Sequence, residues 1–539
     1  MLLAIRRWWV GLAIFAFLSI RLAYLSARPD REWVTNVPDD AFYYVQIASS
    51  WANTGHFSFD VISVTSGFQL LFAYFLACML RLFPVLELRQ LWAITGVLAC
   101  VLFSLAAQSL VDVLDAFDRN ARRRTIHRMA VLATFSCPIA AMLSTNLMES
   151  LFVLPLSVVT LKTLLQGPGP TRRWLVFAVG FAGVSARSDF IVLPAAWLAA
   201  SALFNMRRKT TPILSSVICL MGSMCAEIFI LVHNEILTGR ATQMSAAIKF
   251  HWSQLAGHST IPAIFLVLRT LLPAGLAEAG GIWVIALGAG VIAVSIAAAV
   301  SNYLGRARRA TAEAERMAPS DFFAWDRKYL PFVAACFICA GYVMLYSQDS
   351  AATQSWYGAN LIVPCAVLLF GLLAFIEKYN GATHVWAIVI IYLASSAAGL
   401  AWKPWPFQTQ MYVASMQLGT ERPGGRIGSW NAGIMRYFSK QDVVNLDGLV
   451  DDEAAGDVIE NCIVCFILRH DVRYIADSDV MFQEEYAERG GYGDGRLRRC
   501  ANLLNYLDDA IVRRSNERWR GERFSLYRID RECLQPTPH

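Results

Sequence analysis

Charged residues are scarce in this chain: Asp, Glu, Lys and Arg make up 16% of its 539 residues, whereas soluble domains average about 25%. Hydrophobic residues reach 56%, and many apolar stretches are about 18 residues or longer, enough to cross a bilayer core of roughly 30 Å. The sequence therefore predicts a polytopic helical membrane protein. The net charge of +6 indicates no nucleic-acid partner, because the basic residues cluster in short loops between apolar segments.

Several motifs of soluble enzymes are also missing. The sequence has no P-loop, no G-x-G-x-x-G and no H-E-x-x-H, so it shows no nucleotide site or zinc-protease site of these kinds. It shows no internal repeat, which many transporters have. Cys462 and Cys465 have the spacing of a metal motif, but the second pair expected of a zinc site is absent.

Clusters of basic residues set the predicted topology. The positive-inside rule places four basic loops in the cytoplasm; they are 118–128, 170–173, 205–209 and 305–316. The N-terminus, with Arg6 and Arg7, is placed there too and begins an uncleaved first span. If both apolar segments between residues 66 and 117 crossed, the loop 118–128 would lie outside. We therefore expect 66–84 to lie on the outer surface or to dip in and return, and we assign 261–275 to the same face.

The remaining apolar segments give about eleven crossings, with every basic loop inside. They are 8–26, 90–117, 129–145, 150–166, 174–187, 190–204, 212–236, 278–301, 329–346, 359–377 and 384–402. This topology divides the chain into a transmembrane domain, 1–402, and a periplasmic C-terminal domain, 403–539. The first periplasmic loop is 27–89.

The tail has a different composition, rich in charge, and reads as a small α/β domain that folds on its own. Alternating stretches lie at 442–450, 462–468 and 472–478, and a helical pattern follows at 496–519. Four of the twelve cysteines lie in this tail, and in an oxidising periplasm we expect disulfides among them; they are Cys462, Cys465, Cys500 and Cys533. The other eight lie in apolar segments, where cysteine acts as a small hydrophobe.

The adjacent carboxylates Asp39 and Asp40 are the first candidates for chemistry, because this topology places them outside, at the membrane surface. Two neighbouring carboxylates repel each other and favour a cation, a metal or a shared proton. One of them alone could cap the following helix. The alternative is a general base that activates an acceptor hydroxyl.

Further polar residues fall on the same outer face. Glu149 lies in a short turn between two spans, either as a third catalytic acid or as an acid favoured by a helix N-terminus. Arg187 either pairs with Asp189 or binds an anion, since guanidinium matches the geometry of phosphate. The other candidates for binding a donor phosphate, or merely lipid headgroups, are Lys249, His251 and Arg269.

Aromatic and polar residues near these acids are candidates for binding the sugar or the acceptor. Aromatic rings at this face either anchor the chain at the interface or stack on sugars. The predicted set is Tyr43, Tyr44, His56, Gln69, Trp356 and Tyr357.

Four segments resemble the GT-C superfamily of membrane glycosyltransferases. The stretch "DDAFYYVQIASSWANTGHFSFDVISVTSGFQLL" is similar to a family form that reads DDAYYYLxIAxNxxxGxGFTFDxxxxTNGFxPLW, with Ser66 in place of Asn and Leu-Leu-Phe at 70–72 in place of Pro-Leu-Trp. "LMESLF" resembles a G-M-E-T motif, with Leu147 in place of glycine. "ARSDFIVL" resembles an A-R-x-D stretch, and residues 426–450 resemble a tail motif of bacterial relatives of arabinofuranosyltransferases.

The resemblance implies a GT-C fold and an inverting transferase that takes a sugar from a polyprenyl-phosphate donor. The acceptor is an envelope glycan, a lipid or a protein, the site faces the periplasm, and the chain lies in a bacterial inner membrane among membrane lipids. Asp39 matches the first acid of the family pair and is assigned as the base. Asp40 would orient the acceptor or share a divalent cation with Asp39, and Glu149 matches the second acid. The tail resemblance favours arabinofuranose.

Two other classes of function are weighed against this one. A transporter or flippase of a lipid-linked sugar predicts broken or charged helices at mid-membrane and inverted repeats, and the sequence shows neither. The second of these classes is an interaction scaffold, in which the tail binds partner proteins and the acids only cap helices.

Overall fold

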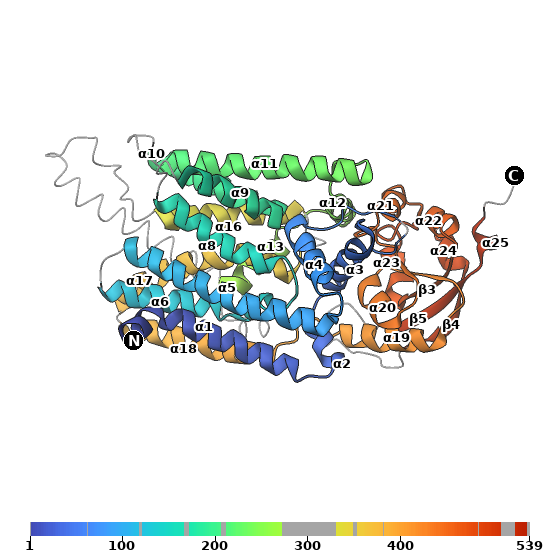
Figure 1. Ribbon diagram of the computed structural model, residues 1–539, viewed down its shortest axis with the longest axis horizontal. Coiled ribbons are helices and arrows are strands. Elements are labelled where there is room, and N and C mark those ends of the chain that lie inside the picture. Colours follow the sequence, from blue (N-terminus) through green and yellow to red (C-terminus); the bar gives the residue numbers. More distant parts are fainter. Residues whose placement is uncertain are drawn as a thin grey trace.

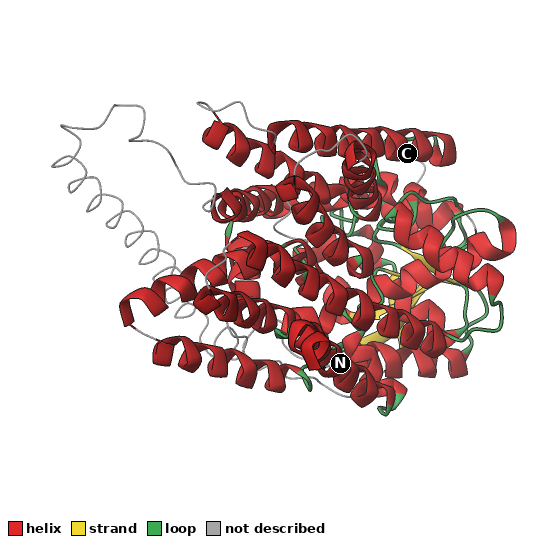
Figure 2. Cartoon of the chain, turned by 60° about the vertical axis from the view of Figure 1, so that its left-hand side comes forward, coloured by secondary structure: helices red, strands yellow, loops and turns green. Residues whose placement is uncertain are grey.

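The computed structural model describes residues 2–61, 63–117, 121–166, 172–205, 212–271, 330–348, 353–380, 382–482, 484–507 and 523–535. In this part of the chain, long helices lie side by side in a bundle, and a smaller domain containing the strands is attached at one end (Figure 1, Figure 2). We call that end the domain end of the bundle.

Four helices of the bundle contain stretches long and apolar enough to cross a membrane, by length and composition. They are α1 (Leu2–Ser26), α5 (Leu88–Phe117), α11 (Pro212–Thr238) and α16 (Leu330–Gln348). Helix α11 exposes large apolar side chains, among them Ile228 and Ile236 at 59% and 82%, which suits lipid better than water. The chain is therefore a multi-pass membrane protein.

Shorter helices, most of them apolar, complete the described bundle. They are α6 (Ala121–Phe135), α7 (Pro138–Leu143), α8 (Ser150–Gln166), α9 (Arg173–Ala186), η3 (Ser188–Ile191), α10 (Val192–Asn205), α17 (Ile362–Asn380) and α18 (Ala382–Gly399). Their positions follow the predicted spans closely, except that the span predicted at 129–145 is broken into α6 and α7. The predicted span 278–301 lies outside the described residues, so the count of eleven crossings stays a prediction.

Short helices lie near the domain end, where they position the site. They are α2 (Asp30–Trp33), η1 (Val34–Asn36), α3 (Asp39–Thr54), α4 (Leu70–Leu82), α12 (Met244–Ala256), α13 (Ile261–Leu271) and η6 (Ser355–Asn360). The predicted surface segment 66–84 corresponds to α4. Its 13 residues extend about 20 Å, too short for a bilayer core of about 30 Å, in agreement with a surface position.

The C-terminal domain is built around a five-stranded mixed sheet of order β2-β1-β3-β5-β4. Strands β1 (Arg426–Ser429), β2 (Val443–Asn445) and β3 (Val472–Ser478) are parallel, and β5 (Phe524–Ile529) pairs antiparallel with both β3 and β4 (Ala501–Tyr506). Its helices are α19 (Gln408–Glu421), α20 (Ala432–Ser439), α21 (Asp452–Ile459), α22 (Ile463–Arg469), η7 (Asp479–Phe482), α23 (Glu484–Ala487), α24 (Arg496–Arg499) and α25 (Arg531–Leu534).

Two local predictions for the tail were wrong. The stretch 462–468 forms helix α22 instead of an alternating strand, because Ile463, Val464, Phe466 and Ile467 lie on one helical face in the core. The helix predicted at 496–519 ends at Arg499, and residues 501–506 form β4. Pairing of β4 with β5 outweighs the local helical preference here; residues 508–519 lie outside the described part.

All four cysteines of the tail form disulfides. Cys462 pairs with Cys465, and Cys500 pairs with Cys533. The expectation of disulfides is therefore confirmed. The sequence left the pairing open: Cys462 and Cys465 are 3 positions apart, whereas Cys500 and Cys533 are 33 positions apart.

The longer bridge is expected to stabilise the domain more. In the loop-entropy model, closing a loop of about 34 residues contributes about 4 kcal/mol, against about 2 kcal/mol for one of about four residues. Replacing Cys500 and Cys533 with serine should therefore increase proteolytic cleavage of the tail more than replacing Cys462 and Cys465. The measurement is pulse proteolysis of the full protein in urea, and a larger loss from the short-loop variant would contradict it.

The C-terminal domain has its own core and also packs against the rest of the chain; whether it folds on its own stays a prediction. Its core cluster includes Met244, Ile248 and Trp252 from α12. Gly67 passes so close to the domain that a Cβ atom there would lie 1.9 Å from the carbonyl oxygen of Leu449. The first loop and the domain thus form one packed unit.

A fully buried arginine joins distant parts of the bundle. Arg21, near the end of α1, donates hydrogen bonds to the carbonyl oxygens of Gly399 and Leu400 at 2.7 and 3.0 Å, and to Asn36 Oδ1 at 3.0 Å. Its Nε lies 3.3 Å from Thr145 Oγ1. The carbonyls at the C-terminal end of α18 accept from the guanidinium, and α1 is thereby fixed to α18 and to the turn after α7.

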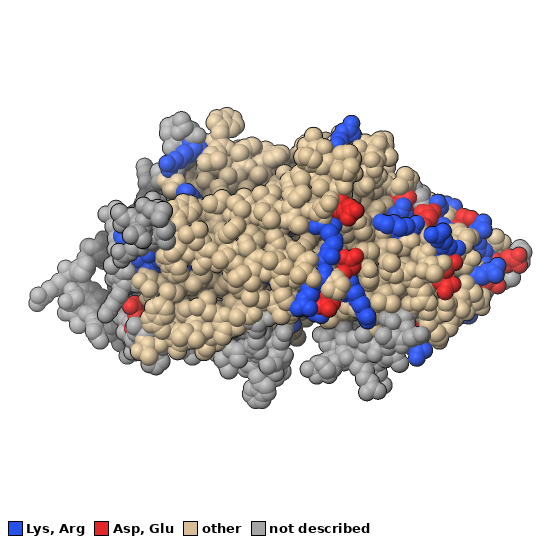
Figure 3. Space-filling view, turned by 60° about the horizontal axis from the view of Figure 1, so that its bottom comes forward, with Lys and Arg blue, Asp and Glu red and all other residues tan. Residues whose placement is uncertain are grey.

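Charge is distributed unevenly over the surface. On the face in Figure 3, Lys, Arg, Asp and Glu gather over the C-terminal domain and at its junction with the bundle, while most of the bundle surface carries none. Exposed ion pairs near the end of α1 include Arg28 with Glu32 and Arg89 with Asp30. This distribution fits a lipid-covered bundle and a water-exposed domain.

Candidate active site

A pocket lies between the bundle and the C-terminal domain, and segments far apart in the sequence form its walls. Nine of the sequence-predicted site residues line it: Asp40, Tyr43, Tyr44, Gln69, Glu149, Arg187, Lys249, Trp356 and Tyr357. The structure thus brings two of the three predicted acids and two of the four predicted cations into one cavity at the domain end.

Asp40 contributes a carboxylate to the pocket from the first turn of α3. Burial raises its pKa above the ordinary value for aspartate, and the positive charge of Lys249 opposes this rise. The Lys249 Nζ donates a hydrogen bond to the Tyr357 hydroxyl at 3.1 Å. Burial acts to lower the pKa of Lys249, but Tyr357 and Asp40 together raise it above its ordinary value. The pocket therefore holds a carboxylate with a raised proton affinity next to a permanent cation.

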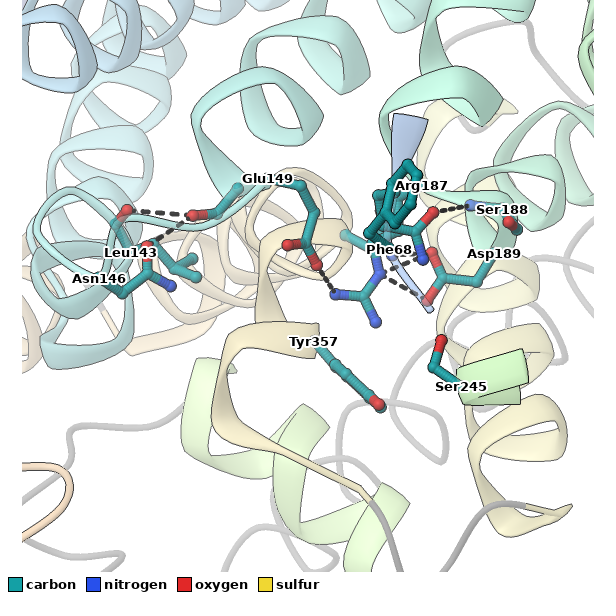
Figure 4. A network of polar contacts seen from close by, with 12 residues as sticks. Phe68, Leu143, Asn146, Glu149, Arg187, Ser188, Asp189, Ser245 and Tyr357 are labelled. Atoms are coloured by element: carbon teal, nitrogen blue, oxygen red, sulfur yellow. Dashed lines mark hydrogen bonds and ion pairs between the residues drawn. The ribbon is translucent and has the colours of Figure 1, made fainter. Parts of the chain in front are cut away.

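Arg187 occupies the opposite part of the pocket wall, between two carboxylates. Its Nη1 lies 2.9 Å from Glu149 Oε1, and its Nε lies 2.9 Å from both oxygens of Asp189. The guanidinium carbon lies 4.1 Å from the centre of the Tyr357 ring, and Figure 4 shows these groups gathered around Arg187. Arg187 pairs with Asp189 and also lines the pocket, so the ion pair and the binding of an anion are compatible roles.

Asp189 has further partners that keep it in place. Tyr346 donates its hydroxyl hydrogen to Asp189 Oδ2 at 2.8 Å, and Asn360 Nδ2 donates to Oδ1 at 2.9 Å. The carboxylate is thus saturated with donors and serves to orient Arg187.

Glu149 is held by an unusual turn between α7 and α8. Leu147 takes the left-handed conformation, with φ of 52°, at the position where the related motif has glycine. Trp92 Nε1 donates to the carbonyl oxygen of Thr145 at 2.7 Å, and Ser150 Oγ donates to Leu143 O and Asn146 Oδ1 at 3.1 and 2.9 Å. The turn is therefore fixed from both sides.

One oxygen of Glu149 is left for a ligand. Oε1 accepts from Arg187, whereas the buried Oε2 has no hydrogen-bond partner among the described residues. Burial raises the pKa of Glu149, and the charge of Arg187 opposes the rise. Buried polar atoms without a partner are costly, so this oxygen is a candidate acceptor for a hydrogen bond from a ligand.

Asp39 points elsewhere. Its Oδ2 accepts the backbone N–H of Gly433 at 3.2 Å and its Oδ1 accepts that of Ile434 at 2.6 Å, so the carboxylate caps the N-terminus of α20 in the C-terminal domain. Burial raises its pKa to about 7, opposed by these amides. Asp39 is not among the residues that line the pocket.

Three predicted site residues lie away from the pocket. His56 is exposed in the turn after α3, His251 lies on α12, and Arg269 is exposed near the end of α13. None of them is among the residues that line the cavity. Their shared position on one membrane face was too coarse a criterion, because that face is much larger than the site.

The sequence analysis missed the part of the pocket that the C-terminal domain supplies. Leu449 and Val450 line it, and Gln243 and Ser245 enter from the segment that starts α12. Asp447 lies close by, with its pKa raised by burial to about 8. The resemblance at 426–450 was a usable signal for Asp447, Leu449 and Val450; Gln243 and Ser245 belong to no motif.

The described residues contain no group of three or more His, Cys, Asp or Glu side chains arranged to hold a metal ion.

Comparison with known families adds little about function. Residues 405–527 match a family model described as "Domain of unknown function (DUF8728)". This match covers only the C-terminal domain and names no activity. No curated protein matches the chain.

Solved structures resemble the chain in fold. The oligosaccharyltransferase of Archaeoglobus fulgidus tethered with an acceptor peptide containing the NVT sequon has 12% sequence identity and a TM-score of 0.50, with 93% of this chain and 73% of that chain covered. The archaeal oligosaccharyltransferase AglB from Archaeoglobus fulgidus, in complex with an inhibitory peptide and a dolichol-phosphate, has 12% sequence identity and a TM-score of 0.47, with 94% of this chain and 74% of that chain covered. ArnT from Cupriavidus metallidurans bound to undecaprenyl phosphate has 14% sequence identity and a TM-score of 0.48, with 98% of this chain and 99% of that chain covered.

At identities this low, the likeness concerns the fold alone. The chain has the GT-C fold, so the prediction of fold class is confirmed.

Proposed function

We propose that this chain is an inverting glycosyltransferase that moves a sugar from a polyprenyl-phosphate to a hydroxyl group of an envelope glycan, lipid or protein. The observation that carries the proposal is the pocket at the domain end, where Asp40, the unpartnered oxygen of Glu149, Arg187 and Lys249 converge. The GT-C fold supports it, because the sequence motifs that contain Asp40, Glu149 and Arg187 resemble those of enzymes with this fold.

The site would face the periplasm. The described residues next to the basic loops 118–128, 170–173 and 205–209 lie at the opposite end of the bundle from the C-terminal domain (Figure 1). The positive-inside rule assigns that opposite end to the cytoplasm. A polyprenyl-phosphate held in the outer leaflet would then present its sugar at the domain end of a bacterial inner membrane.

Asp40 is the base that the geometry favours, in place of Asp39. The acceptor oxygen attacks the anomeric carbon while Asp40 takes the hydroxyl proton, a new C–O bond forms, and the bond from that carbon to the phosphate oxygen breaks. The products are the glycosylated acceptor and a free polyprenyl phosphate. Direct displacement inverts the anomeric centre.

Two cations are available for the phosphate that leaves. Lys249 and Arg187 line the same pocket, and preorganised cations stabilise charge that develops during a reaction. Two carboxylates, Glu149 and Asp189, already contact Arg187. Because carboxylates offset the positive charge of these cations, the site suits the single phosphate of a phosphodiester donor better than a diphosphate.

Tyr43, Tyr44, Gln69, Trp356 and Tyr357 would contact the sugar or the acceptor, since all of them line the pocket. We assign arabinofuranose as the sugar on the resemblance of residues 426–450. The assignment of the sugar is independent of the roles of Asp40 and Arg187.

A transfer assay tests the proposal. Purified protein in detergent is given a polyprenyl-phosphate carrying radiolabelled arabinofuranose, together with an arabinose oligosaccharide and, separately, an extract of envelope glycans. We expect label in the acceptor fraction with wild type, and transfer at least about a hundredfold slower with Asp40→Asn. Movement of the labelled lipid across liposomes without transfer would instead identify a flippase and overturn the proposal.

A further inference from the structure

The two acids that open α3 face different partners. Asp39 and Tyr43, one helical turn apart, both contact the C-terminal domain: Tyr43 accepts a hydrogen bond from the N–H of Ala432 at 3.2 Å, and Asp39 takes the next two amides. Asp40 and Tyr44, the next pair on the helix, line the pocket, which Tyr43 also lines. Asp39 is therefore on an attachment surface of α3, Asp40 is on the adjacent face that carries the proposed chemistry, and Tyr43 lies at the boundary between them.

The attachment point lies at a special place in the domain. In open α/β sheets, ligands bind at the carboxyl ends of parallel strands where the strand order reverses, which here is the boundary between β1 and β3. The residues that follow β1 and open α20 lie at this boundary. Asp477 at the end of β3 accepts the amides of Trp430 and Asn431 at 2.6 and 3.0 Å, and Asp39 takes those of Gly433 and Ile434.

The packing around Asp39 leaves no room for displacement. A Cβ atom on Gly433 would lie 2.5 Å from the carbonyl oxygen of Asp39 and 2.7 Å from its Oδ1. Helix α20 therefore approaches the start of α3 as closely as it does because residue 433 is glycine. The same domain supplies Leu449 and Val450 to the pocket wall.

We infer that Asp39 is a positioning residue that ties the C-terminal domain to α3, and that this domain of unassigned function is thereby part of the catalytic site. Through the amides of α20, Asp39 fixes the first turn of α3, which carries Asp40, against the loop of the domain that closes the pocket. The expected effect of Asp39 on turnover rests on the proposed function. The attachment of Asp39 to the amides of α20 does not depend on that function.

The attachment is tested without any substrate. Amide hydrogen exchange of residues 432–436 is measured in the full protein in nanodiscs for wild type, Asp39→Asn, Gly433→Ala and the control Asp442→Asn. Losing hydrogen bonds to a charged group should speed exchange of the Gly433 and Ile434 amides by about tenfold or more in the first two variants. Asp442 is an exposed acid of the same domain, paired with Arg426 and Arg436, and its variant should exchange like wild type.

The role of Asp39 in turnover is tested with two substitutions, one on each side of the contact between α3 and α20. Both Asp39→Asn and Gly433→Ala should lower kcat by a similar factor, about ten to a hundred, because each misplaces the first turn of α3. The acidic limb of the pH profile should persist in both and disappear only in Asp40→Asn. Restoring the carboxylate alone, in Asp39→Glu, should recover less than half of the lost rate, since the longer side chain cannot keep the same spacing.

Two results would overturn the inference. If the amides of α20 exchange at the wild-type rate in Asp39→Asn, the Asp39 carboxylate does not attach the C-terminal domain to α3. Loss of the acidic limb in Asp39→Asn, with Gly433→Ala close to wild type in turnover, would make Asp39 the base. If even wild type shows no transfer, the proposed function fails, while the exchange measurement still decides the attachment.

Discussion

Replacing Asp40 with asparagine is expected to lower turnover by at least a hundredfold, within the range of about 10²–10⁴ that loss of a positioned general base causes. Asparagine keeps the size of the side chain and its place in the first turn of α3, so the fold and the binding of the lipid donor should be unchanged. Turnover and donor binding are measured on the same purified sample, the first by label transfer and the second by tryptophan fluorescence.

The pH profile of the wild type provides a second check on Asp40. A base must be unprotonated to act, and burial raises the pKa of Asp40 above the ordinary value for aspartate. Activity should therefore be lost as the pH falls through this raised pKa, at a higher pH than for an exposed aspartate.

Asp30→Asn serves as the control, since this acid pairs with Arg89 on the surface and lies outside the pocket. It should transfer sugar at the wild-type rate. If Asp40→Asn keeps more than about a tenth of wild-type turnover, Asp40 is not the base, and Glu149 becomes the next candidate.

Arg187→Met is expected to affect both stability and donor binding. Its guanidinium is buried, at 6% exposure, and contacts Glu149 and Asp189. Removing one partner of a buried ion pair costs about 3–5 kcal/mol, because the other charges remain without compensation. The variant should unfold at a lower temperature, and its affinity for the polyprenyl-phosphate should fall.

A double variant separates these two effects. Arg187→Met with Glu149→Gln removes one of the two stranded carboxylates, so part of the lost stability should return. Donor binding should not return, because the cation is still missing. Recovery of donor binding in the double variant would show that Arg187 only neutralises Glu149 and does not bind phosphate.

Arg187→Lys refines the result. Lysine keeps the charge but cannot contact Glu149 and Asp189 with the fixed fork of a guanidinium. Its stability should lie between those of wild type and Arg187→Met, and a value equal to wild type would mean that charge alone matters.

The sequence was sufficient to find most of the bundle and part of the site. Long apolar segments and basic loops define helices and their ends, because the bilayer restricts both. The same reasoning placed Asp40, Glu149 and Arg187 on one face, and the structure brings them into one pocket. The GT-C fold followed from the motifs around them.

The division of labour between Asp39 and Asp40 was not accessible from the sequence. Neighbours on a helix point about 100° apart, so one of them must face away from any given partner. Which one faces the pocket depends on where α20 and the loop after β2 approach α3, and those contacts join residues almost 400 positions apart. No local pattern carries this information.

Tertiary contacts also decided the secondary structure of the tail. Residues 501–506 read as helical in isolation, yet they form β4 at the sheet edge next to β5. Cys500, immediately before this strand, is tied to Cys533. The partner strand and the bridge are both distant in the sequence, so a local reading could not include them.

The buried Arg21 has a consequence for biosynthesis. This guanidinium belongs to α1, but the carbonyl of Gly399 that accepts its 2.7 Å hydrogen bond is 378 positions further along the chain. A nascent chain therefore carries an arginine in α1 that has only Asn36 and Thr145 as partners until the end of α18 has been inserted, and an arginine with unsatisfied donors in lipid is costly. A chain that stops before α18 would present this incompletely satisfied arginine to the quality-control proteases of the membrane.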